Sequence, residues 1–105
     1  MLETNNDIEF ESIQEVDLID VVNQLEKDIQ SSGERYEFTS ETPENLISEL
    51  SDYLKKVDKG TRLSNLLYRI DVNTAYMDPK QPYYVSLSRV IWNRIFQKVW
   101  FRKNY

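Results

Sequence analysis

The chain contains neither cysteine nor histidine. Without cysteine it has no disulfide, no thiolate nucleophile and no thiolate metal site. Without histidine it lacks the commonest general base and the commonest transition-metal ligand. Only 2 glycines and 3 prolines occur among its 105 residues, which is too few for a turn-rich all-β domain or a glycine-rich phosphate loop. We therefore expect no enzyme activity, no cofactor and no metal ion.

Long apolar runs are also missing, because no stretch approaches the roughly 18 residues of a membrane span. The first seven residues are polar and acidic, unlike a secretory signal. Hydrophobic residues make up 40% of the chain and charged residues 30%, which is a globular composition of single-domain length. We expect a soluble, cytoplasmic chain without membrane contact.

Apolar residues recur at helical spacing in four parts of the chain. These segments are residues 12–32, 42–59, 61–71 and 83–103. We therefore predict an all-α fold, a small single-domain bundle of about four helices. The helical domain is expected to span residues 12–105, after an acidic N-terminal arm of residues 1–11 that is flexible or extended.

Residues with strong end preferences delimit these helices. Thr42 followed by Pro43 is typical of an N-cap and the first helical position. Ser12 with Glu15 matches a capping box, and Thr61 is placed to cap the third helix. The predicted helix bounds rest on these signals.

Two short segments alternate between apolar and polar residues and leave a strand alternative open. They are residues 8–11 and 83–88. The segment 34–41 also alternates, at Tyr36 and Phe38, and we expect it to cover the core as a linker.

The net charge of −5 hides an uneven distribution. Residues 1–58 hold 16 acidic and 4 basic residues, a net charge of −12, whereas residues 59–105 hold 2 acidic and 9 basic residues, a net charge of +7. Oppositely charged halves attract each other within one fold or present charged faces to external partners. We expect internal pairing.

The last 30 residues hold eight of the 13 aromatic residues, interleaved with basic ones. Aromatic and arginine side chains dominate protein interfaces, and the same mixture binds single-stranded nucleic acid; burial in the core is a third explanation. Apolar residues surround much of the last predicted helix, which indicates burial on several sides or completion by a partner. The candidate interface residues are Arg89, Trp92, Arg94, Phe96, Lys98, Trp100, Phe101 and Arg102.

Three of these basic residues form one ridge, because Arg94, Lys98 and Arg102 are spaced four apart on a predicted helix. Like charges at this spacing destabilise a helix by about 0.2–0.5 kcal/mol per pair. We therefore expect acidic groups opposite the ridge. The acidic outer face of residues 17–28 supplies them, and an external acidic partner is the alternative.

The sequence favours a non-enzymatic protein-interaction module, a small cytoplasmic adaptor or regulator. Self-association into a homodimer through the last helix would cover its apolar surface. One alternative is an acidic inhibitor of the immunity type that binds a basic partner through residues 3–28. Another is nucleic-acid binding through the last helix. A helix-turn-helix around Gly60 is not supported, because Lys56 stands where that motif requires a small residue.

Overall fold

The computed structural model describes residues 10–13 and 15–104. Its four α-helices are α2 (Glu15–Ser31), α3 (Pro43–Val57), α4 (Arg62–Ile70) and α5 (Tyr83–Asn104). A short 3-10 turn, η1 (Phe10–Ser12), precedes α2, and a second one, η2 (Thr74–Tyr76), lies between α4 and α5. The described ranges contain no strand, so the predicted all-α bundle of four helices is confirmed. The strand alternative at residues 83–88 is wrong, because α5 begins at Tyr83.

The described part of the chain begins with a residue of the core. Phe10 is only 1% exposed, and burying a phenylalanine contributes about 1.5–3 kcal/mol to folding. Phe10 and Glu11 therefore pack with the helices, although the sequence assigned them to the N-terminal arm. The rest of that arm, residues 1–9, lies outside the described residues, and so do the capping side chains of Ser12 and Glu15.

Helix α3 begins as its end signals predict. The Thr42 hydroxyl accepts a hydrogen bond from the Asn45 N–H at 3.2 Å, and Pro43 occupies the first turn. Thr61 precedes α4, but its side chain makes no capping hydrogen bond, a correction to its expected role. The chain leaves α4 through Asp71 with a φ of 67°, a left-handed conformation that Asp tolerates better than most residues.

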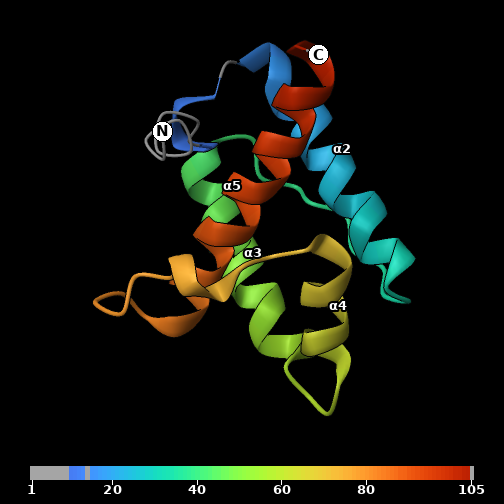
Figure 1. The fold of residues 1–105 in the computed structure, drawn as a ribbon, viewed down its shortest axis with the longest axis vertical. Coiled ribbons are helices and arrows are strands. Elements are labelled where there is room, and N and C mark those ends of the chain that lie inside the picture. The colour runs from blue at the N-terminus through green and yellow to red at the C-terminus, as the bar shows by residue number, and fades with distance from the viewer. Residues whose placement is uncertain (1–9, 14, 105) are drawn as a thin grey trace.

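Helix α5 is the centre of the bundle and contacts every other helix and both short turns. Figure 1 shows α5 running antiparallel to both α2 and α3, with α4 at the lower right beside α3. Burial on several sides within one chain accounts for its apolar circumference. No described helix is both long enough and apolar enough to cross a membrane.

Two side chains of α5 join it to the first turn of α3. The Trp92 indole N–H donates to the Leu46 carbonyl at 3.0 Å, and the Ser88 hydroxyl donates to the Ile47 carbonyl at 2.7 Å. All four residues are buried. These directional contacts fix the register of α3 on α5, which apolar packing alone specifies less sharply.

The linker of residues 34–41 covers the core, as expected. Tyr36 and Phe38 are half-buried and pack against the core. Glu49 of α3 holds the linker, because its carboxylate accepts hydrogen bonds from the Tyr36 hydroxyl at 2.6 Å and from the Ser40 N–H at 2.9 Å, and from the Thr39 N–H. Burial alone would raise the pKa of Glu49, but these hydrogen bonds outweigh it and hold the pKa below its usual value.

Candidate protein-interaction surface

The acidic and basic halves of the chain neutralise each other across the fold. Among the described residues, four basic residues of the C-terminal half form ion pairs with acids of the N-terminal half. These pairs are Arg62–Glu34 (2.7 Å), Arg89–Glu11 (2.7 Å), Lys98–Asp28 (3.7 Å), and Lys103 with both Asp17 (2.9 Å) and Asp20. The expected internal pairing of the two halves therefore occurs, and much of each charged face is occupied by the other.

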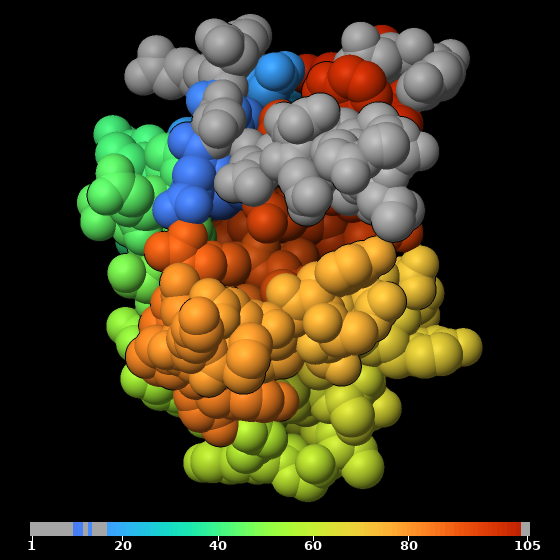
Figure 2. Space-filling model, turned by 60° about the vertical axis from the view of Figure 1, so that its left-hand side comes forward, coloured from blue at the N-terminus to red at the C-terminus, as the bar shows by residue number. Residues whose placement is uncertain are grey.

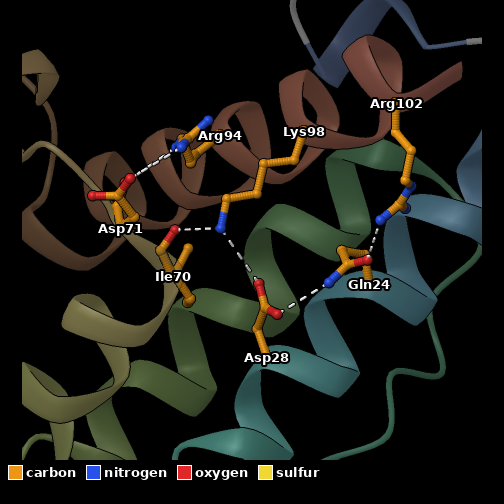
Figure 3. Close-up of polar contacts among 7 residues, drawn as sticks. All are labelled: Gln24, Asp28, Ile70, Asp71, Arg94, Lys98 and Arg102. Carbon is orange, nitrogen blue, oxygen red and sulfur yellow. Dashed lines mark hydrogen bonds and ion pairs between the residues drawn. The ribbon is translucent and has the colours of Figure 1, made fainter. Parts of the chain in front are cut away.

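The basic ridge of α5 lies against α2 and the end of α4 (Figure 3). Lys98 donates to the Ile70 carbonyl at 2.7 Å and lies 3.7 Å from the Asp28 carboxylate. Arg102 donates to the side-chain carbonyl of Gln24 at 3.0 Å, and the Gln24 amide donates to Asp28. Gln24 thus links Arg102 to the acid that Lys98 faces.

Arg94 has a different partner from the one expected. Its guanidinium contacts both the carbonyl and the carboxylate of Asp71, each at 3.1 Å, rather than an acid of α2. Among the side chains that the structure describes, Lys98 is the one member of the ridge that forms an ion pair with α2, whereas Lys103, one residue beyond the ridge, pairs with Asp17 and Asp20. The hydrogen bonds from Lys103 lower the pKa of Asp20.

The Lys98 contacts yield a stability prediction. Lys98→Met keeps the aliphatic stem but removes the charged hydrogen bond to Ile70 and the ion pair with Asp28. We expect a loss of about 1–3 kcal/mol in the free energy of unfolding, the usual effect for a charged hydrogen bond. Arg102→Met is the matched control, with a smaller loss because its exposed guanidinium donates to a neutral amide. Urea denaturation followed by circular dichroism measures both, and equal losses would contradict the anchoring role of Lys98.

Two of the candidate interface residues are core residues. Trp92 is fully buried and Phe96 nearly so. Neither side chain therefore forms part of an exposed surface in this fold. Their burial follows from the central position of α5, because helices pack around the whole length of its middle section.

The remaining candidates are spread along α5 from Arg89 to Arg102. Trp100 is half-buried, while Phe101 is 42% exposed and packs edge-on against Trp100 at 5.2 Å. Arg89, Arg94 and Lys98 are engaged in the pairs described above. The structure therefore separates the eight residues into core, paired and partly exposed groups rather than gathering them into one surface.

Three exposed tyrosines lie in α4, in η2 and at the start of α5, where the sequence analysis proposed no site. Tyr68 of α4 is 90% exposed, Tyr76 of η2 is 71% exposed and Tyr83 at the start of α5 is 53% exposed. We call these three residues the tyrosine surface. Figure 2 shows the connection between α4 and α5 in yellow to orange at the front of the molecule.

The connection between α4 and α5 is held by local hydrogen bonds. The Asp78 N–H donates to the Ser86 hydroxyl at 2.7 Å, and the Asp78 carboxylate accepts the Lys80 N–H at 2.9 Å. The Asn73 side chain accepts the Ala75 N–H at 2.9 Å, and Met77 packs on the core. These contacts fix the backbone that positions Tyr76.

Tyr83 is supported by its neighbour. Its ring packs edge-on against the ring of Tyr84 at 5.1 Å. The Tyr84 hydroxyl donates to the Asp58 carboxylate at 2.5 Å, and this hydrogen bond raises the pKa of Tyr84. The hydrogen bond fixes Tyr84 to the end of α3, and the Tyr84 ring in turn supports the ring of Tyr83.

Comparison of the chain with protein-family models, with curated proteins and with solved structures finds no match. Its function therefore has to be argued from its own residues.

A surface pocket of ≈ 310 Å³ opens between α2 and the linker. Asn23, Glu26, Lys27 and residues 35–37 contribute to its walls. Glu26 is engaged in holding the linker, since its carboxylate accepts the Phe38 N–H at 2.8 Å. Within the described ranges, no group of three or more acidic residues is arranged to hold a metal ion. We assign no ligand to this pocket.

Proposed function

We propose that the chain is a non-enzymatic protein-interaction module that binds a partner protein through the tyrosine surface. The observation that carries this proposal is the exposure of Tyr68, Tyr76 and Tyr83 in a molecule that buries most of its other aromatic rings at least partly. Tyrosine is among the residues that contribute most to binding energy at protein interfaces.

The rigidity of the connection supports binding rather than a purely structural role. Ordering a mobile loop on binding costs free energy, and a loop that is already fixed avoids much of that cost. Asp78 organises two of the hydrogen bonds that fix this connection, and Tyr84 braces Tyr83. The tyrosines are thus presented in a fixed arrangement.

The charges near the tyrosine surface indicate the chemistry of the partner. Arg69 and Lys80 are exposed, and neither side chain forms an ion pair or hydrogen bond within the described part of the chain. Unlike Arg94 and Lys98, they are not neutralised internally. We expect a partner whose contact surface combines acidic and apolar groups.

Other functions have less support. The acids available to an inhibitor of basic proteins include Asp17, Asp20 and Asp28, which already face basic residues of α5. Nucleic-acid binding through the ridge would need Arg94 and Lys98, which are paired in the same way. Homodimerisation through α5 was expected to cover the apolar surface of that helix. Within the chain, α2, α3 and α4 already pack against α5, so a second copy is not needed for this.

Replacing all three tyrosines of the surface by alanine should abolish partner binding without unfolding the chain. One interface tyrosine removed from a hot spot costs about 2 kcal/mol, roughly 30-fold in affinity, and three should cost more. The immobilised chain is used to capture proteins from a lysate of its own cells, which are quantified by mass spectrometry. Circular dichroism checks that the variant remains folded.

Ile19→Ala is the matched control, because Ile19 is 68% exposed but lies on α2. It should retain the captured partner at the wild-type level. Equal capture by the triple variant and the wild type would contradict the proposal. So would equal loss of capture in the Ile19→Ala control, or capture only of nucleic acid.

A further inference from the structure

The site that holds Phe10 has the features of a peptide-recognition site. The Phe10 ring stacks on Trp92 of α5, with the ring centroids 4.7 Å apart and the planes at 9°. The backbone N–H of Phe10 donates to the Asn93 side chain at 2.8 Å, and the Glu11 carboxylate pairs with Arg89 at 2.7 Å. We call the receiving residues, Arg89, Trp92 and Asn93, the Phe10 site.

Each residue of the Phe10 site recognises a different group of the bound segment. Trp92 receives an aromatic ring, Asn93 accepts a backbone N–H, and Arg89 binds the carboxylate of the following residue. Phe38 packs edge-on against Trp92 at 5.0 Å and so supports the ring on which Phe10 stacks. Together they define an aromatic residue followed by an acidic one as the fitting sequence.

The contact between Arg89 and Glu11 leaves part of the arginine unused. Within the described ranges, the Nη1 atom of Arg89 lies 2.7 Å from the Glu11 carboxylate, and the buried Nε atom has no acceptor. A guanidinium can bind a carboxylate through two parallel hydrogen bonds. Arg89 can therefore bind a better-placed carboxylate more tightly than it binds Glu11.

The bound segment is attached to the bundle mainly by side chains. Within the described residues, its backbone is held by a turn bond from the Ile13 N–H to the Phe10 carbonyl at 3.1 Å and by the Phe10 N–H, which donates to the Asn93 side chain. The Glu11 side chain adds the ion pair with Arg89 of α5. Segments with so few backbone hydrogen bonds open locally at lower free energy than the helices they rest on.

We propose that the Phe10 site is a binding site for a partner segment in which an aromatic residue precedes an acidic one, and that Phe10 and Glu11 occupy it within the chain until they are displaced. The proposal goes beyond the tyrosine surface, because it uses other residues on other elements. Displacement is intramolecular competition, in which the tethered segment acts at a high effective concentration.

A synthetic peptide of residues 7–13 tests the site directly. In a chain carrying Phe10→Ala, the tethered competitor is weakened, and the peptide should bind at least tenfold more tightly than to the chain with Phe10 present. Both chains carry Trp100→Phe, so that the fluorescence of Trp92 alone reports binding. Circular dichroism establishes that both chains are folded.

Charge reversal separates recognition from a general loss of packing. A peptide with Glu11→Arg should bind the Phe10→Ala chain at least tenfold more weakly than the unchanged peptide. Arg89→Glu in that chain should restore its binding. A folded Phe10→Ala chain that binds no peptide at millimolar concentration, or binds all peptides alike, would overturn the proposal.

If the Phe10→Ala chain does not fold, hydrogen exchange of the wild-type chain tests the proposed displacement of Phe10 and Glu11. The amides of Phe10 and Ile13, whose hydrogen bonds hold the segment, should exchange at least 100-fold faster than those of Ile91 and Ile95. Their rates should also be insensitive to low urea concentrations. Exchange of all four amides only through global unfolding would overturn the proposal, and it would leave the tyrosine surface unaffected.

Discussion

Replacing Trp92 by alanine should lower the free energy of unfolding by about 3–5 kcal/mol, the range for truncating a large buried aromatic residue. The side chain is fully buried, stacks on Phe10 and donates its indole N–H to the Leu46 carbonyl. The variant therefore leaves a cavity at the junction of α3 and α5 and removes the hydrogen bond that joins the two helices through the Leu46 carbonyl. A small domain of ordinary stability has about 5–15 kcal/mol in total, so this change removes a large part of it.

Urea denaturation followed by far-UV circular dichroism measures the Trp92 effect. Trp100→Ala is the matched control, because Trp100 is half-buried near the end of α5, and its loss should be clearly smaller. Trp92→Phe should fall between the two, since it keeps an aromatic ring but loses the hydrogen bond. Similar losses for Trp92→Ala and Trp100→Ala would contradict the central place of Trp92.

Glu49→Gln should lower the free energy of unfolding by about 2–3 kcal/mol, because it removes the charge from several hydrogen bonds at once. The carboxylate accepts from the Tyr36 hydroxyl and from the N–H groups of Thr39 and Ser40. The glutamine amide has one acceptor oxygen and one NH₂ donor, so it can accept fewer of these hydrogen bonds than the carboxylate does. Glu41→Gln is the control, since Glu41 is exposed and makes none of these contacts.

The Glu49 effect should depend on pH in one direction. The pKa of Glu49 is lowered from 4.5 in the folded chain, so the unfolded chain binds its proton first as the pH falls. The stabilisation is therefore complete above the unfolded pKa and is lost as the pH falls through the folded one. The difference between the wild type and Glu49→Gln should shrink on acidification, and a difference that grows would contradict this account.

The helices could be predicted closely because their signals are local. The predicted segment 42–59 corresponds to Pro43–Val57, and 83–103 corresponds to Tyr83–Asn104. Caps, apolar spacing and the proline lie within a few residues of each helix end, so sequence alone locates them. Burial of Phe10 could not be predicted, because its partner Asn93 lies 83 residues away in the chain.

The candidate site was harder to predict than the fold, because periodicity describes one helix at a time. Periodicity correctly placed Arg94, Lys98 and Arg102 on one ridge. It could not predict that Arg94 forms an ion pair with Asp71 at the end of α4. It also could not separate buried Trp92 from exposed rings on the same helix.

Tyr68 had a signal in the sequence. It lies two residues from both Leu66 and Ile70, which are buried, and so falls on the opposite side of α4. Exposed rings at such positions mark candidate interfaces better than the density of aromatic residues along the chain, because the densest region mixes buried rings such as Trp92 and Phe96 with exposed rings such as Tyr76 and Tyr83.

Site-specific photo-crosslinking tests the proposed function most directly. A photoreactive phenylalanine analogue is placed at position 68 or 76 of the full chain, with position 19 as the exposed control, and irradiated in its native cells. We predict that positions 68 and 76 yield an adduct with the same partner protein and that position 19 does not. Adducts only with a second copy of the chain, or the same adduct from position 19, would contradict binding through the tyrosine surface.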